Sequence, residues 1–490
     1  MVLLRRRNSI LGLLGARSGI NRAGIQSFDA VIGVLMSEPI LHQQLARKIG
    51  LGTAIAVTVG STIGSGIFRT PAGIAEALPG PLPMLICWAV AGLLALCGAL
   101  TLAEVGSAHP ETGGLYAFIR DAFGRLPAFL FGWAQLFLIR PAGVGAVAMA
   151  FAEYALRAFD IQVPEESMIP HYVGAAAIVV VSFFNYIGVK VGGGIQSLTT
   201  ILKVLGLMTV VVIALVTVLP TSGGNFSPAW PEGSFSLTPF ALALISVLWA
   251  YDGWADASYV AGEVVDPKRN VPRALVWGTI GIIAVYLLAN LAYLSVYPVG
   301  TIAKSPLIAA DVAQHLMGPA GVVFISVTVM ISTFGTLNGS MMTAPRIFFA
   351  MADDRLFFRP VAHVSERFGT PGVATWLACI LGVGFVLNAK FEHLADIFVT
   401  AMIPFYAIAV GTIFWMRKQN DYEPSVRTPL FPATPILFIA AMLFIFGNAL
   451  WEESSRLATL GVCGGILLGV PVYFLTVGRR LSEPDPGPSA

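Results

Sequence analysis

Two long apolar stretches carry polar and flexible residues at their centres. The first, residues 51–77, contains the run Gly60-Ser61-Thr62-Ile63-Gly64-Ser65-Gly66 about ten residues after its start. The second, residues 237–263, contains Trp249-Ala250-Tyr251-Asp252-Gly253 about twelve residues after its start. Glycine weakens a helix, and a carboxylate is costly in apolar surroundings. Both stretches are therefore predicted to be helices that break near their midpoints.

A broken helix offers binding groups that a continuous helix does not. The break frees N–H groups at the start of one half and C=O groups at the end of the other, which attract an anion and a cation respectively. A zwitterionic amino acid carries both charges on one carbon. We expect the half-helix that begins near Ser65 and Gly66 to hold its carboxylate, and the carbonyls of Thr62, Trp249 and Asp252 to hold its ammonium. The glycines could instead serve close helix packing alone, but the matched pair of interruptions favours a binding site.

Other charged residues also lie within or beside apolar stretches. Lys203 is about eight residues into the stretch 195–219, too deep for its ammonium to reach water easily. It is predicted to be either a structural counter-ion or a fixed cation beside the first break. For Arg140 the sequence points to no single partner, and we expect a structural bond to helix-end carbonyls. Glu263 and Arg269 lie at the cytoplasmic end of the second broken stretch, where they could close an inner gate or form a solvated loop pair worth at most about 1 kcal/mol.

Composition places these stretches in a membrane. Of the 490 residues, 56% are hydrophobic and only 11% are charged, and the mean hydropathy is +0.79. Soluble domains carry about 25% charged residues, so the bilayer must solvate most of this chain. A net charge of +2 speaks against a nucleic-acid partner. The four cysteines lack CxxC spacing and the histidines lack HExxH spacing, so neither a metal nor a cofactor is expected.

Twelve segments are long and apolar enough to cross a bilayer, which takes about 20 residues per helix. They are roughly 51–77, 82–108, 126–158, 171–189, 195–219, 237–263, 271–297, 319–350, 372–389, 393–416, 432–451 and 457–478. The predicted fold class is therefore an all-α membrane protein with a transporter domain over 49–478. Residues 1–48 and 479–490 are predicted to be cytoplasmic tails, because most of the 29 lysines and arginines then fall on the inner side.

Several motifs resemble the amino acid–polyamine–organocation superfamily and, within it, a prokaryotic member of the L-type amino acid transporters. In chain order they are GSTIGSGIF, Glu104, the loop Pro110–Tyr116, Phe137–Pro141, AYDGW followed by Gly262–Pro272, Phe334–Ser340 and Gly469–Phe474. The resemblance covers residues 46 to about 478. It implies sodium-independent exchange of amino acids by alternating access.

The same resemblance implies a LeuT-like fold, in which two inverted repeats of five helices are joined by two additional helices. The repeats would span about 51–219 and 237–416, and the additional helices about 432–478. Substrate-binding positions of the family match Thr62, Ser65, Gly66, Trp249, Asp252 and Tyr286 here, with Trp249 in the place of an aromatic gate. Lys203 matches a lysine that stands where sodium-coupled relatives bind an ion.

Two departures from the family pattern bear on partners and substrate. Animal L-type transporters carry a cysteine between spans 3 and 4 that bonds to a heavy chain, whereas residues 159–170 contain none. No disulfide-linked partner is therefore expected. Asp252 replaces a glycine common in the animal members. We expect Asp252 to cap the second half of its broken helix; the alternative is a carboxylate that faces the cavity and favours cationic substrates or carries a proton.

Together these features predict a permease in the plasma or inner membrane that exchanges neutral amino acids without sodium. The alternative is a proton-coupled or cationic amino acid or polyamine carrier. A non-transporting receptor or a membrane enzyme is a remote third, because the sequence shows no soluble domain and no Ser/His/Asp set at membrane depth.

Overall fold

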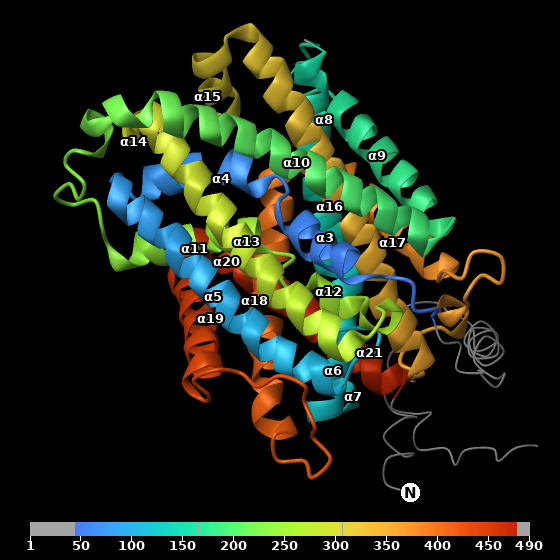
Figure 1. The fold of residues 1–490 in the computed structure, drawn as a ribbon. Coiled ribbons are helices and arrows are strands. Elements are labelled where there is room, and N and C mark those ends of the chain that lie inside the picture. The colour runs from blue at the N-terminus through green and yellow to red at the C-terminus, as the bar shows by residue number, and fades with distance from the viewer. Residues whose placement is uncertain (1–44, 160, 165, 306, 478–490) are drawn as a thin grey trace, which may run out of the picture.

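The computed structural model describes residues 45–477 except 160, 165 and 306. The C-terminal tail predicted over 479–490, and all but the last four residues of the tail predicted over 1–48, lie outside the described residues. Within the described part the chain is helical, and β-pairing is limited to one isolated bridge between Ile49 and Val264. Figure 1 shows the helices gathered into a single body. The all-α prediction is thus confirmed for this part of the chain.

Ten helical segments of the described chain are long and apolar enough to cross a membrane. Their helices are α3 (Leu51–Thr62) with α4 (Gly66–Ala77), α5 (Pro81–Ala108), α7 (Arg125–Ala134) with α8 (Arg140–Ala158), α9 (Ile169–Tyr186), α10 (Val189–Thr217), α13 (Pro267–Val296), α16 (Pro319–Asp353), α18 (Phe391–Met416), α19 (Ala433–Trp451), and α20 (Glu453–Leu467) with α21 (Gly469–Thr476). Two shorter apolar helices are α11 (Leu237–Tyr251) and α17 (Gly372–Val386). The protein is therefore a multi-pass membrane protein.

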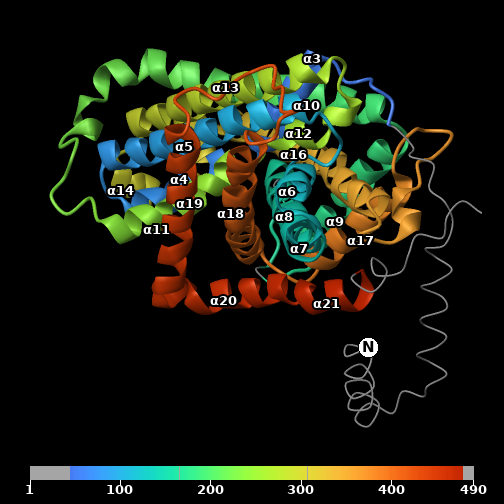
Figure 2. The same ribbon diagram turned by 90° about the horizontal axis from the view of Figure 1, so that it is seen from below.

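Short helices connect these segments. They are α6 (Leu115–Phe123), α12 (Asp256–Tyr259), η4 (Ala261–Glu263), α14 (Val299–Ile302) and α15 (Ile308–Met317). Figure 2 shows α20 and α21 in line with each other and turned away from the end of α19. Only Leu468 separates α20 from α21.

The first break lies between α3 and α4, where it was predicted. Helix α3 ends at Thr62, and α4 begins at Gly66 after three non-helical residues. A Cβ added to Gly66 would lie 2.5 Å from the Cα of Ala250 on α11, closer than real Cβ atoms come to other atoms. Glycine at this position therefore lets the start of α4 lie directly against the second broken helix.

The second break follows α11. Asp252 is extended, with φ −58° and ψ 147°, and Gly253 has φ +103°, a left-handed conformation that favours glycine. The chain then forms one helical turn, α12, and the 3₁₀ turn η4. A Cβ on Gly253 would lie 2.8 Å from the backbone nitrogen of Thr62, so the two breaks touch each other through backbone.

Long helices surround the two breaks. Helix α13 packs along α5, as Figure 1 shows, and also contacts α3. Helix α16 packs against α8, α10 and α3, and α4 packs against α11. The breaks are thereby enclosed by protein, which is the condition under which non-helical backbone is tolerated inside a membrane.

Candidate functional site

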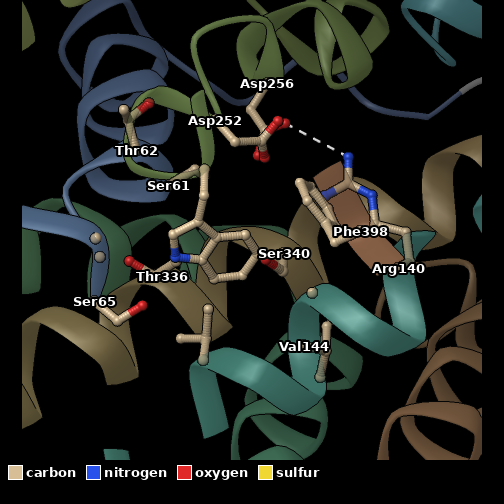
Figure 3. Close-up of a pocket in the computed structure, with 15 residues that line it drawn as sticks. Ser61, Thr62, Ser65, Arg140, Val144, Asp252, Asp256, Thr336, Ser340 and Phe398 are labelled. Carbon is tan, nitrogen blue, oxygen red and sulfur yellow. Dashed lines mark ion pairs between the residues drawn. The ribbon is translucent and has the colours of Figure 1, made fainter. Parts of the chain in front are cut away.

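A cavity lies where the two breaks face α8, α16 and α18 (Figure 3). It is lined by Ser61, Thr62, Gly64, Ser65 and Gly66 at the first break, Trp249, Asp252 and Asp256 at the second, Arg140, Gly143, Val144 and Val147 on α8, Thr336 and Ser340 on α16, and Phe398 on α18. The structure thus brings five of the predicted site residues to one cavity: Thr62, Ser65, Gly66, Trp249 and Asp252.

The start of α4 offers hydrogen-bond donors to this cavity. Amides in the first turn of a helix have no acceptor within the helix, and they carry its positive end. Ser65 precedes the first turn, and its side chain makes no capping bond. Its Oγ is buried and has no hydrogen-bond partner among the described residues. An anionic group in the cavity could therefore accept hydrogen bonds from Ser65 and from the first amides of α4.

The end of α3 is occupied by the side chain of Lys203. Its fully buried ammonium donates to the carbonyl oxygens of Gly60 at 2.8 Å, Ile63 at 2.6 Å and Ser332 at 2.8 Å, and lies 3.2 Å from Thr336 Oγ1. A cation at this place faces the negative end of a helix. Lys203 therefore joins α10 and α16 to the first break, as the fixed-cation hypothesis requires.

Tyr286 lies behind the cavity, and it is absent from the cavity wall. Its buried hydroxyl is 2.8 Å from the carbonyl oxygens of both Thr62 and Ala250. Because one carbonyl belongs to each broken helix, Tyr286 ties the two breaks together. The structure therefore gives Tyr286 a positioning role, and its predicted contact with substrate stays a prediction.

Trp249 forms an aromatic cluster at the cavity. The centre of its ring lies 5.2 Å from the centre of the Phe398 ring and 5.8 Å from that of Phe391, and both contacts are edge-on. The guanidinium of Arg69 lies 4.2 Å from the centre of the Phe391 ring. Trp249 is half-buried, so its flat surface can cover the cavity if the cluster moves.

Asp252 is hydrogen-bonded by the backbone N–H of Gly253, as the cap prediction expects, but it is not the N-cap of the next helix. The N-cap of α12 is Ala255, and no side chain bonds to that helix start. Three residues, including the left-handed Gly253, separate Asp252 from the first helical residue of α12. It accepts a hydrogen bond from the hydroxyl of Tyr406 and lines the cavity. This is the arrangement of the alternative hypothesis.

Arg140 has side-chain partners that sequence reasoning missed. Its guanidinium lies 3.5 Å from Asp256 Oδ1 and donates to Gln135 Oε1 at 3.1 Å (Figure 3). It also lies 5.2 Å from the centre of the Tyr259 ring. The expected bond to helix-end carbonyls is replaced by these contacts.

Local helix geometry explains the position of Arg140. A π-helical turn, Gln135–Ile139, immediately precedes it, and such turns are frequent at functional sites. Asp256 carries the one signal that could have been noticed, since it lies four residues after Asp252 within an apolar stretch.

Glu263 pairs with Arg346 rather than with Arg269. Arg346 Nε lies 2.7 Å from Glu263 Oε1, and Nη2 lies 3.1 Å from Oε2. Both residues are 1% exposed, whereas Arg269 is exposed to solvent. The predicted solvated loop pair is thus wrong, because η4 turns the Glu263 side chain inward against α16.

Two broken helices that line one cavity inside a multi-pass membrane protein are typical of membrane transport proteins. Residues 49–459 match the family described as amino acid permease, and the chain belongs to this family. The predicted superfamily is thereby confirmed.

Three relatives show how far this similarity extends. The chain is 32% identical over 443 residues to the serine/threonine exchanger SteT of Bacillus subtilis, which covers 89% of this chain and 98% of that protein. It is 30% identical over 447 residues to the mouse b(0,+)-type amino acid transporter 1, which covers 90% of this chain and 91% of that protein. It is 31% identical over 445 residues to the mouse large neutral amino acids transporter small subunit 2, which covers 88% of this chain and 81% of that protein.

Proposed function

We propose that this protein exchanges amino acids across a membrane by alternating access and without sodium. The observation that carries the proposal is the pair of helix breaks that line one cavity, where α4 begins at the first break and α11 ends at the second. The names of its relatives, which include an exchanger of serine and threonine, support the same function.

The backbone of the two breaks would bind the part that all amino acids share. The carboxylate would accept hydrogen bonds from Ser65 and from the amides at the start of α4. The ammonium would approach the carbonyls at the ends of α3 and α11, near Thr62, Trp249 and Asp252. Trp249 would cover the bound molecule, and opening and closing of this cover would accompany each half of the exchange.

The position of Lys203 supports sodium independence. A sodium ion beside the first break would need the same carbonyl oxygens, those of Gly60 and Ile63, that the lysine ammonium already contacts. The ammonium is covalently tethered, so it cannot be released with the substrate. The driving force would then come from the amino acid gradients alone.

Neutral amino acids are our leading substrate class, and cationic amino acids are the second candidate. The observation that favours the second is the placement of Asp252 and Asp256 on one cavity wall with a single guanidinium, that of Arg140. A lysine-like side chain or a proton could supply the missing positive charge. We expect no enzymatic reaction. We also expect no disulfide-linked heavy chain, since residues 159–170 contain no cysteine.

We further propose that the protein lies in the plasma or inner membrane and crosses it twelve times. Its helices would form a five-plus-five inverted repeat, and both termini would be cytoplasmic. The two short apolar helices α11 and α17, added to the ten long segments, support that count. The second half of span 6 would be completed by α12 and η4. The excess of lysine and arginine on one side supports the orientation.

Exchange in proteoliposomes tests the proposal. Purified protein is reconstituted with or without internal unlabelled alanine, and entry of labelled alanine, leucine, serine and lysine is measured in sodium and in choline buffer. We expect entry to require an internal amino acid and to be equal in the two buffers. Entry that needs sodium would overturn the assignment of Lys203, and no entry of any amino acid would overturn the function.

A further inference from the structure

The segment that follows the second break fills the space between the cavity and one end of the protein. We call residues 256–264 the inner half-helix, and we call the end at which Ile49 pairs with Val264 the inner end. Asp256 lines the cavity, whereas Glu263 lies at the inner end. Between them Ala257, Ser258 and Val260 are fully buried. The inner half-helix therefore seals the cavity on this side.

Glu263 holds the inner half-helix at its inner end through both its side chain and its backbone, beside the bridge between Ile49 and Val264. Its carboxylate makes the two-pronged contact with Arg346 on α16, where both side chains are shielded from solvent. Its carbonyl oxygen accepts hydrogen bonds from the backbone amides of Lys48 at 2.8 Å and Ile49 at 2.9 Å. Glu263 thus fastens the inner ends of both broken helices to α16.

The cavity end of the inner half-helix is fastened in a similar way. Asp256 lies 3.5 Å from Arg140 on α8 and 3.5 Å from Thr343 Oγ1 on α16. At both ends, therefore, the acid belongs to the inner half-helix and the arginine belongs to a long surrounding helix. Apolar side chains of similar size would hold a permanent contact at least as well as a buried ion pair does. A buried pair differs in that entering water can solvate both partners once they separate.

The Arg346 contact leaves one donor unused in the sealed state. Nη1 of Arg346 is buried and makes no hydrogen bond among the described residues. An unsatisfied buried donor gains a partner as soon as water reaches it. Arg346 therefore has one donor left for a further partner while Nε and Nη2 contact Glu263.

We propose that the Glu263–Arg346 pair is the inner latch of the transporter. While the pair is closed, the inner half-helix seals the cavity; the pair separates when the cavity opens to the inner end. This inference rests on the proposed function for the need to open at all. The latch proposal adds only that the contact between Glu263 and Arg346 is the one that must break for the cavity to open.

Chemical access to a buried reporter tests the latch. Ser258 is fully buried in the inner half-helix and faces the loop at Gly114, so Ser258→Cys places a small thiol inside the seal. A membrane-impermeant methanethiosulfonate reagent is applied to the inner face of sealed vesicles without any substrate. We expect Glu263→Gln and Arg346→Gln each to raise the modification rate at least tenfold, and we expect the exchanged pair Glu263→Arg with Arg346→Glu to restore protection.

Control variants separate the latch from general loosening. Glu104 is a fully buried carboxylate that pairs with Arg417 at 2.7–2.8 Å and belongs to α5, away from the inner half-helix. Glu104→Gln should leave the reporter protected, and protein lacking Ser258→Cys gives the background from the four native cysteines. Glu263→Asp, which keeps the charge and shortens the reach, should give an intermediate rate if the neutral variants do not fold.

The outcomes are distinct. Unchanged reporter modification in Glu263→Gln, Arg346→Gln and Glu263→Asp would overturn the latch. An equal rise in Glu104→Gln would also overturn it. Because no substrate is added, a latch that behaves as expected in a protein without amino acid exchange would leave the latch in place and refute the proposed function instead.

Discussion

Replacing Lys203 by methionine removes the ammonium and keeps most of the side-chain volume. Three carbonyl oxygens then lose a charged donor, and each such hydrogen bond is worth about 1.5–3 kcal/mol. Part of this is recovered, because the hydroxyls of Ser332 and Thr336 lie 2.8 Å from the Ile63 carbonyl and 3.0 Å from the Gly60 carbonyl. The buried charge also no longer has to be desolvated. We expect a net loss of about 2–4 kcal/mol in the stability of the first break, which is about 30-fold or more in the population of the competent site.

Exchange of labelled leucine in proteoliposomes measures this loss at equal amounts of reconstituted protein. The matched control is Lys190→Met, which changes an exposed lysine near the start of the same helix and should keep full activity. Size-exclusion profiles show whether each variant is folded. If folded Lys203→Met exchanged leucine within about twofold of the parent, the ammonium would not be needed to hold the first break.

Three further substitutions test the cavity. Trp249→Ala should slow exchange and weaken apparent affinity more than about twofold because it removes the aromatic cover, whereas Trp277→Ala, at a 63% exposed position, should change neither. Asp252→Asn should selectively remove lysine exchange or flatten its dependence on pH between 5 and 8 if the carboxylate acts on cations; equal loss of alanine exchange would argue against that role. Gly66→Ala should cost about 1–3 kcal/mol by forcing the broken helices apart, and would lower thermal stability and exchange. Gly73→Ala in the same helix meets no atom within 4 Å, so equal damage there would refute the packing argument.

The breaks themselves could be predicted from sequence because their causes are local. Glycines and serines at the centre of an apolar stretch weaken the helix wherever the chain later packs. The same holds for Lys203, since a lysine deep in an apolar helix needs several carbonyl acceptors, and helix ends supply them. The short length of α11, 15 residues, follows from the break that ends it.

The partners of the buried charges could not be predicted in the same way. Glu263 and Arg346 are 83 residues apart, and the pairing depends on how α16 lies against η4. Arg140 reaches Asp256 after a π-helical turn, which leaves no clear pattern in the sequence. The direction of the Asp252 side chain depends on the left-handed backbone of Gly253 rather than on the helix-start preference of aspartate.

The division of the cavity wall has a consequence for how such a protein can diverge. One part of the wall is main chain, fixed by Lys203, Tyr286 and the close contact at Gly66. The other part consists of side chains, those on α8, α16 and α18 together with Trp249, Asp252 and Asp256 at the second break. Mutations in the second part could alter which side chain fits without disturbing the groups that we propose to bind the common carboxylate and ammonium. A duplicated copy of this protein could therefore acquire a new substrate in single steps, and each intermediate would still fold and still hold an amino acid.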